Sequence, residues 1–217
     1  MGDEETNPKV HTLQEVVRRV ADIAISGTAL LLLAPFMMVV AAVIRATSPG
    51  PALFKQERVG RGRQQFWLYK FRTMRMGVDD KALREMIARE LRGEDTSSRG
   101  SRKLDGDSRI TPVGALLRRT SLDELPQLIN VLRGDMSIVG PRPCLDWEAD
   151  MFPQEYQLRF AVRPGITGLW QVSGRSTVGT LDMLRLDVEY VRQRSLWGDA
   201  KILLRTVPVV LRGDGAR

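Results

Sequence analysis

An uncharged hydrophobic run near the N-terminus is the strongest constraint on this 217-residue chain. Ile23 to Ile44 contains 22 residues without a formal charge, which is long enough for a transmembrane helix. Pro35 lies in the middle of the run, and basic residues flank it on both sides, so neither flank is marked as cytoplasmic. The residues alone leave two topologies open: a helix that spans the membrane, and one that turns back at Pro35 within one leaflet.

The basic residues are concentrated just after this run. Lys and Arg outnumber Asp and Glu by 33 to 26, and the segment 45–75 carries eight basic residues against the single acidic Glu57. A basic block beside an apolar segment favours anionic lipid or phosphate as its partner, with nucleic acid as the second alternative. The single cysteine, Cys144, excludes an intramolecular disulfide, and one histidine adds too little for a Cys/His metal cluster.

The basic block contains a predicted β-hairpin, in which two strand-like pieces flank the turn residues 60–63. In the second piece, residues 66–71, strand alternation and its continuation place Lys70 and Arg72 on one face. The aromatic residues, beginning at Trp67, occupy the other face as in a buried strand, which argues against an exposed platform for stacking bases. A solvated turn and a phosphate-facing strand both remain compatible with this composition.

Two adjacent carboxylates, Asp123 and Glu124, precede an apolar helical pattern that ends at Gly134. Ser121 and Glu124 fit a capping box at the start of that helix, and this structural role would by itself explain them. A start nearer Asp123 fits Pro126 better, because a proline deeper in the helix would remove a hydrogen bond.

The neighbours of these carboxylates suggest a chemical role as well. Thr111 and Pro112 form an N-cap and N1 pair, and the short helix that they open delivers Arg118 and Arg119. We expect the arginines and the helix end to keep Asp123 and Glu124 ionised, which suits a nucleophile or a metal ligand and not a general acid.

A rigid turn presents another candidate. Arg142 stands between Pro141 and Pro143, so its guanidinium is carried on a backbone with little freedom. A fixed guanidinium fork matches two phosphate oxygens. An ordinary surface arginine in a turn is the alternative interpretation.

Helical spacing predicts further helices in the ranges 79–91, 147–160 with an interruption at Pro153, and 181–197. The final apolar segment, 197–212, is too short to span a bilayer and carries several basic residues. It fits either an amphipathic helix in the membrane interface or a helix buried in the core.

Three sequence blocks resemble one bacterial enzyme family. They are KQERVGRGRQQFWLYKFRTM (55–74), SLDELPQLINVLRGDMSIVGPRP (121–143) and RPGITGLWQVSGR (163–175). In this order they closely resemble the bacterial polyprenyl-phosphate sugar-1-phosphate transferases, also called monotopic phosphoglycosyl transferases. With the hydrophobic N-terminus, the resemblance extends from about residue 17 to about residue 211.

The resemblance implies an α+β, predominantly helical fold. We expect a small membrane-associated catalytic domain with a short basic β-hairpin, an N-terminal re-entrant membrane helix and interfacial amphipathic helices. The expected divisions are a polar N-terminal tail (1–15), a re-entrant helix broken at Pro35 (16–47) and a catalytic domain (48–217). The chain looks like the minimal catalytic form of the family. The implied location is the bacterial inner membrane, with the catalytic domain on the cytoplasmic face.

The resemblance also implies a chemistry. Asp123 would attack the β-phosphate of a UDP-sugar, release UMP and carry the sugar-1-phosphate until a polyprenyl phosphate accepts it, and Glu124 would bind Mg²⁺. The expected partners are the UDP-sugar donor, the polyprenyl (undecaprenyl) phosphate acceptor and membrane lipids, without nucleic acid, and a homodimer is left open. The implied substrate- and phosphate-binding residues are Lys70, Arg72, Arg118 and Arg142, with Arg163 and Arg175 in the active-site wall.

Two other classes of protein remain to be distinguished from the enzyme. A membrane-anchored nucleic-acid-binding protein would use the basic segment 45–75, and salt-sensitive retention of RNA or DNA would support it. A membrane scaffold without catalysis is the other alternative, and release of UMP from UDP-sugars would exclude it. The sequence leaves open which sugar is transferred and in which polysaccharide pathway.

Overall fold

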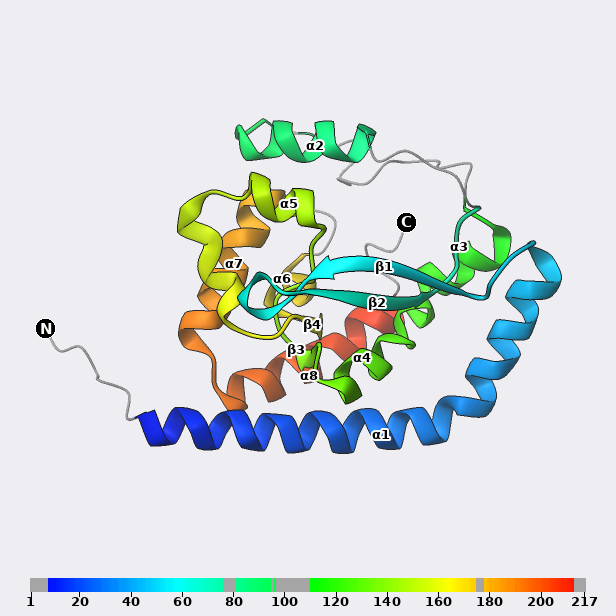
Figure 1. The fold of residues 1–217 in the computed structure, drawn as a ribbon, viewed down its shortest axis with the longest axis horizontal. Coiled ribbons are helices and arrows are strands. Elements are labelled where there is room, and N and C mark those ends of the chain that lie inside the picture. The colour runs from blue at the N-terminus through cyan, green and yellow to red at the C-terminus, as the bar shows by residue number, and fades with distance from the viewer. Residues whose placement is uncertain (1–7, 76–80, 95, 97–109, 175–177, 213–217) are drawn as a thin grey trace, which may run out of the picture.

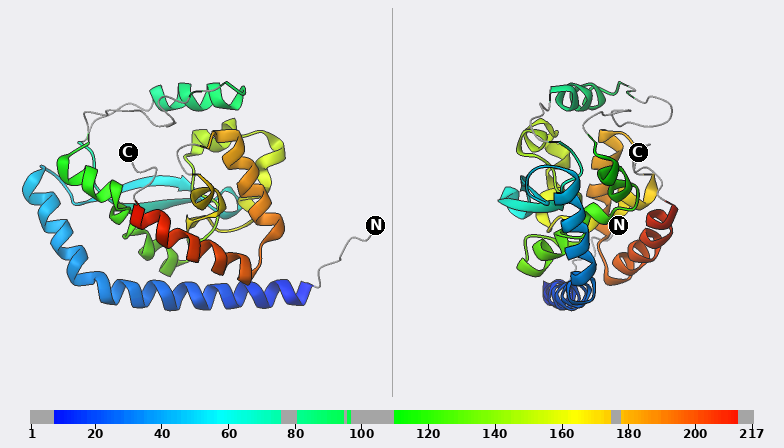
Figure 2. Two further views of the ribbon diagram at one scale, coloured as in Figure 1. Left: turned by 180° about the vertical axis from the view of Figure 1, so that it is seen from behind. Right: turned by 90° about the vertical axis from the view of Figure 1, so that its right-hand side faces the viewer.

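A long N-terminal helix, α1 (Pro8–Thr47), runs along one side of the molecule and bends part way along (Figure 1). The structure, a computed structural model, describes residues 8–75, 81–94, 96, 110–174 and 178–212. The helix begins inside the expected polar tail and continues through Pro35. The helix is therefore continuous where the sequence predicted a break, and a proline inside a helix is a usual cause of a bend such as the one that is also visible from behind (Figure 2). From Leu13 to Thr47 its length and composition would allow it to cross a membrane.

The other helices are short and follow in chain order. They are α2 (Lys81–Leu91), α3 (Pro112–Arg119), α4 (Gln127–Arg133), α5 (Asp146–Met151), α6 (Leu169–Ser173), α7 (Thr180–Gln193) and α8 (Leu196–Arg212), with 3₁₀ turns η1 (Arg61–Arg63), η2 (Leu122–Glu124) and η3 (Gln154–Ala161). The expected α+β, predominantly helical architecture is confirmed for the described part of the chain. As predicted, Thr111 caps α3 by accepting a hydrogen bond from the Gly114 N–H, and Pro153 separates α5 from η3.

The predicted basic hairpin is present in the middle of the molecule (Figure 1). Strands β1 (Leu53–Val59) and β2 (Gln65–Phe71) are antiparallel, and Phe54 pairs with Lys70. Lys70 therefore shares a face of the hairpin with Leu68, which is buried. The prediction that the aromatic residues form a buried face is wrong for Trp67, which is 51% exposed.

A second, parallel pair of strands was not predicted. Strand β3 (Ser137–Val139) lies beside β4 (Gly165–Thr167), where the sequence indicated only a rigid turn. The two backbones approach so closely that a Cβ atom on Gly165 would lie 2.1 Å from the Gly140 nitrogen. Glycine at position 165 is thus required by the approach of these strands.

One hydrophobic core joins the hairpin to the helices α4, α7 and α8. Its buried members include Leu68 of β2, Val131 of α4, Tyr190 of α7 and Ile202 of α8. A second cluster packs Val40 and Ile44 in α1 against Phe71 of β2 and Leu117 of α3. The two clusters hold η2, which carries the acidic pair, between the hairpin, α3 and α4.

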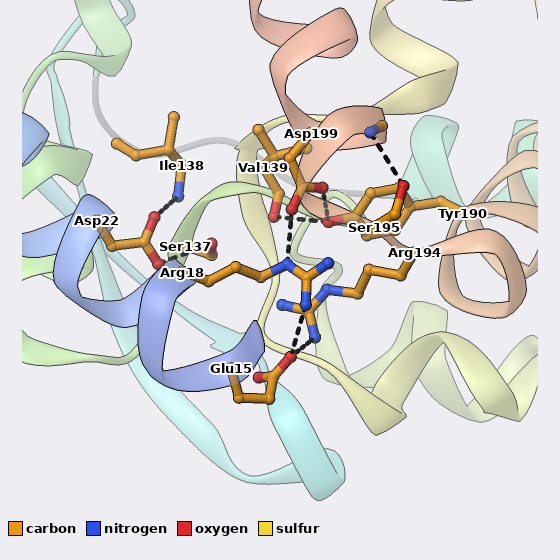
Figure 3. Close-up of polar contacts among 11 residues, drawn as sticks. Glu15, Arg18, Asp22, Ser137, Ile138, Val139, Tyr190, Arg194, Ser195 and Asp199 are labelled. Carbon is orange, nitrogen blue, oxygen red and sulfur yellow. Dashed lines mark hydrogen bonds and ion pairs between the residues drawn. The ribbon is translucent and has the colours of Figure 1, made fainter. Parts of the chain in front are cut away.

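The first part of α1 is attached to the rest of the protein by buried polar contacts (Figure 3). Asp22 accepts hydrogen bonds from the Ile138 N–H at 2.9 Å and the Ser137 hydroxyl at 2.8 Å, both in β3. Arg18, one turn earlier, donates to Asp199 of α8 at 2.6 Å. Because residues four apart share a helix face, one side of α1 is committed to these contacts.

The opposite side of α1 is apolar and exposed. The same is true of one side of α8, although Ile202 on its other side belongs to the core, so α8 partly fits both interpretations of the final segment. Contiguous exposed apolar surface of this kind is typical of an interaction with a membrane or another protein. The most exposed large apolar side chains of these two helices are Leu13, Val20, Leu31, Leu32, Met38 and Val39 in α1 and Trp197, Leu204 and Val207 in α8.

We predict that Asp22→Ala lowers the free energy of unfolding by about 1–3 kcal/mol, because the Ile138 N–H and the Ser137 hydroxyl lose their acceptor in a buried site. Denaturant unfolding in detergent micelles measures this change. Glu57→Ala is the matched control, since Glu57 is exposed and its loss should cost less than about 0.5 kcal/mol. Equal stability of the two variants would show that Asp22 does not fasten α1.

Candidate active site

The two adjacent carboxylates lie in the 3₁₀ turn η2, between α3 and α4. Ser121 adopts a left-handed backbone conformation with φ of 56°, and its side chain caps no helix, so the predicted capping box is wrong. Helix α4 begins only at Gln127, because Pro126 occupies its N-cap position and can supply no N–H to an earlier turn. It ends at Gly134, with φ of 92°, as predicted.

Glu124 forms an ion pair with Lys70 of β2, in which Lys70 Nζ lies 3.2 Å from Glu124 Oε1. Both side chains are only partly accessible to solvent, so water screens the attraction less than at an open surface. Burial lowers the pKa of Lys70, and the neighbouring Glu124 opposes that effect. The contact joins the hairpin to η2 across 54 residues of sequence.

Asp123 has an unusual acidity. Burial and the adjacent Glu124 carboxylate raise the pKa of Asp123 to about 6, although Lys70 and Arg118 act in the opposite direction. The sequence predicted full ionisation from the basic neighbours, but it gave no measure of this burial. At neutral pH most molecules carry Asp123 as a carboxylate, and the charge is easily lost on mild acidification.

A cleft beside this turn brings several predicted residues together. Its empty volume is about 260 Å³, including space open to solvent. Three predicted residues line it: Lys70, Glu124 and Arg142. Its wall also contains Arg58, Leu68, Gln127, Pro143, Gly165, Ile166 and Gln171.

Sequence reasoning did not select Arg58 or Gln171 as site residues. A signal existed for Arg58, because it lies opposite Phe66 in the hairpin and therefore on the same face as Lys70. Gln171 lies in the third family-like block, and its amide nitrogen donates to the Ile166 carbonyl at 2.8 Å. Its place in the cleft depends on the unpredicted β3–β4 pairing.

The remaining predicted arginines lie elsewhere. Arg118 is at the end of α3, where its charge acts on Asp123. Arg72 is buried and donates to the carbonyl of Ser48, just beyond α1, which places it beneath the end of that helix. Arg163 donates to the Gly134 carbonyl at 2.8 Å and does not line the cleft. Arg175 is outside the described residues.

The carboxylates can provide only part of a metal site. Within the described ranges, no three His, Cys, Asp or Glu side chains gather around a common point. Two adjacent carboxylates nevertheless fit Mg²⁺, which commonly takes one or two protein carboxylates and completes its shell with substrate phosphates and water.

A carboxylate pair among cations, beside a helix with an exposed apolar face, defines a class of membrane-associated enzyme that acts on phosphate groups. The bacterial sugar transferase family model matches residues 13–213, and the chain belongs to that family. The resemblance of the three sequence blocks is thereby confirmed, and the protein is an enzyme of the sugar transferase type.

Named relatives support this assignment. The chain is 45% identical over 169 residues to the galactosyl transferase CpsE of Streptococcus agalactiae, covering 77% of this chain and 36% of CpsE. It is 38% identical over 213 residues to the exopolysaccharide production protein ExoY of Rhizobium meliloti, covering 98% and 93%. It is 42% identical over 207 residues to a UDP-glucose:undecaprenyl-phosphate glucose-1-phosphate transferase of Caulobacter vibrioides, covering 92% and 71%.

We predict that the Asp123 carboxyl titrates near pH 6, more than one unit above an ordinary aspartate. Carbon-detected NMR of the carboxyl signal, assigned by its loss in Asp123→Asn, measures the midpoint. Lys70→Met should move the midpoint upward, because Lys70 lowers the pKa of Asp123. A midpoint near pH 4 in the native protein would contradict the burial of this carboxylate.

Proposed function

We propose that the protein transfers a sugar-1-phosphate from a UDP-sugar to a polyprenyl phosphate, with undecaprenyl phosphate as the acceptor, in the first step of exopolysaccharide, O-antigen or glycoconjugate assembly. The names of the relatives support a nucleotide-sugar donor and a lipid-phosphate acceptor. The observation that carries the proposal is Asp123, a half-buried carboxylate with a raised pKa beside the Glu124–Lys70 ion pair. Glu124 and Lys70 line the cleft together with Arg142, whereas Asp123 is not among the lining residues.

In the proposed reaction, an oxygen of Asp123 attacks the β-phosphorus of the donor. The bond from this phosphorus to the bridging oxygen breaks, UMP leaves with the electron pair, and the sugar-1-phosphate is held on Asp123 as an acyl phosphate. An oxygen of the acceptor phosphate then attacks the same phosphorus. The bond to Asp123 breaks, which regenerates the carboxylate and gives a polyprenyl diphosphosugar.

The cations near Asp123 have separate roles in this scheme. Arg142 lines the cleft and binds donor phosphate, and Lys70 holds Glu124 while offering positive charge to the same phosphates. Arg118 stabilises the ionised form of Asp123 before attack. Glu124, with the donor phosphates, would hold Mg²⁺, which supplies charge neutralisation when bound.

In this proposal the exposed apolar faces of α1 and α8 lie against the membrane, which brings a lipid acceptor to the cleft. We infer that α1 enters one leaflet and returns at its bend, so that both ends of the helix lie on the cytoplasmic side of the bacterial inner membrane. The basic segment 45–75 then lies at the anionic lipid surface. Because Trp67 is exposed, it does not argue against a nucleic-acid-binding protein. The family assignment is what favours an enzyme.

We predict that intact-protein mass spectrometry detects a sugar-phosphate adduct after incubation with a UDP-sugar and Mg²⁺, without acceptor. Asp123→Asn should abolish the adduct and lower turnover by about 10³-fold or more, because the nucleophile is gone. Asp146→Asn, an exposed aspartate in α5, should form the adduct normally. Near-native turnover in Asp123→Asn would refute the assignment, and full adduct formation in excess chelator would remove Mg²⁺ from it.

The inferred topology is tested by labelling. Single cysteines replacing Thr6 and Ser48, each in a Cys144→Ser background, should resist a membrane-impermeant thiol reagent in intact cells and react after lysis. Both positions behave alike because a re-entrant helix returns the chain to the side from which it entered. Labelling of position 6 alone from outside would instead mean that α1 spans the membrane.

A further inference from the structure

Arg159, in η3, is a buried arginine next to the cleft that the proposed reaction does not use. Only 3% of it is exposed, and its guanidinium donates hydrogen bonds to α7 and to the loop that carries Arg142. Nε and Nη2 bond to Asp187 Oδ2 of α7 at 3.1 and 2.8 Å. Nη2 also bonds to the main-chain carbonyl of Arg142 at 2.7 Å, and Nη1 lies 3.2 Å from Cys144 Sγ.

A fully buried ion pair is energetically less favourable in a protein core than apolar side chains of similar size. Taking Arg159 and Asp187 out of water carries a large desolvation penalty for each ion, and well-packed apolar residues often serve stability as well or better. The surroundings are otherwise apolar, since the guanidinium lies 5.1 and 5.2 Å from the ring centroids of Phe152 and Phe160. The charges therefore call for an explanation beyond packing.

The loop that carries Arg142 suggests an explanation for the buried Arg159–Asp187 pair. Each carbonyl from residue 141 to residue 144 accepts a hydrogen bond: that of Pro141 from the Gly165 N–H at 2.8 Å, that of Cys144 from the Val59 N–H at 2.9 Å, and that of Pro143 from Arg58 at a longer 3.4 Å. The Arg142 carbonyl is held from the core by Arg159. The prolines fix two φ angles of the loop, and this bond fixes the peptide plane from which the Arg142 side chain extends.

The Arg142 side chain itself is exposed and lines the cleft. Its charge acts on Lys70, which also lines the cleft, and on the buried Asp187. A guanidinium that must meet two phosphate oxygens gains from being positioned before the ligand arrives, because less freedom is then lost on binding.

We propose that Arg159, held in place by Asp187, is a positioning residue that aims Arg142 at the diphosphate of the nucleotide-sugar donor. This inference rests on the proposed function, in which Arg142 binds donor phosphate. It assigns to the buried pair a specific effect on donor binding, separate from any contribution to folding.

A double-mutant cycle of Arg159→Lys and Arg142→Ala tests the inference, with the KM and kcat for UDP-sugar measured by UMP release. Lysine keeps the charge but cannot bond to Asp187 and the Arg142 carbonyl through one planar fork. Each single variant should raise the KM about tenfold with a smaller change in kcat. The double variant should be no worse than Arg142→Ala, because both changes remove the same interaction. Multiplied effects, or an unchanged KM in either single variant, would overturn the inference.

Two further variants separate positioning from general damage to the core. Asp187→Asn keeps the shape of the partner, and it should raise the KM as Arg159→Lys does, so the inference stays testable if the lysine variant does not fold. Phe152→Leu disturbs the same cluster but leaves the bond to the Arg142 carbonyl, so its KM should be unchanged. A tenfold rise in Phe152→Leu would overturn the inference in favour of packing. Failure of the proposed function is recognised separately, by the absence of the Asp123 adduct in the native protein.

Discussion

Charged groups that leave water must find partners, and this requirement governs how α1 joins the rest of the protein. Asp22 meets an N–H and a hydroxyl of β3, and Arg18 meets a carboxylate of α8. Arg19 meets the last carbonyls of α4 at 2.6 and 2.8 Å. A rotation of the helix would leave these groups buried without partners, at a cost greater than their pairing gains. The apolar face opposite them is therefore fixed relative to the cleft.

The same requirement operates differently at the acidic pair. Glu124 is compensated by Lys70, but burial outweighs the cations around Asp123 and makes its negative charge costly. Bond formation to phosphorus would remove the negative charge from Asp123. Because the site stabilises that charge only weakly, little electrostatic stabilisation is lost when the carboxylate reacts. The neighbouring cations are already in place to meet the charge that passes to the phosphate oxygens. In the proposed reaction, a half-buried carboxylate beside Lys70 and Arg118 would thus combine a reactive ground state with a prepared transition-state environment.

Much of this architecture could be predicted because its signals are local. The cap of α3, the glycine that ends α4 and the basic hairpin each depend on a few neighbouring residues. The start of α4 was misjudged, because Ser121 takes a left-handed conformation in place of a cap. Contacts between distant segments left no such signal. The Asp22–Ser137 bond spans 115 residues, and the β3–β4 pairing and the Arg159–Asp187 pair join segments with no shared pattern.

The polar attachment of α1 also determines whether this helix can be removed from such an enzyme by truncation. A helix joined to a domain only by a linker could be excised, exchanged or moved to another protein without harm to the domain. Here excision would expose a β3 N–H, a hydroxyl and the end of α4 at once, together with the apolar surfaces beneath Val40 and Ile44. If α1 contacts lipid as proposed, lipid contact and catalysis reside in one inseparable unit. A water-soluble version requires a redesigned outer face of α1, and the helix itself must stay.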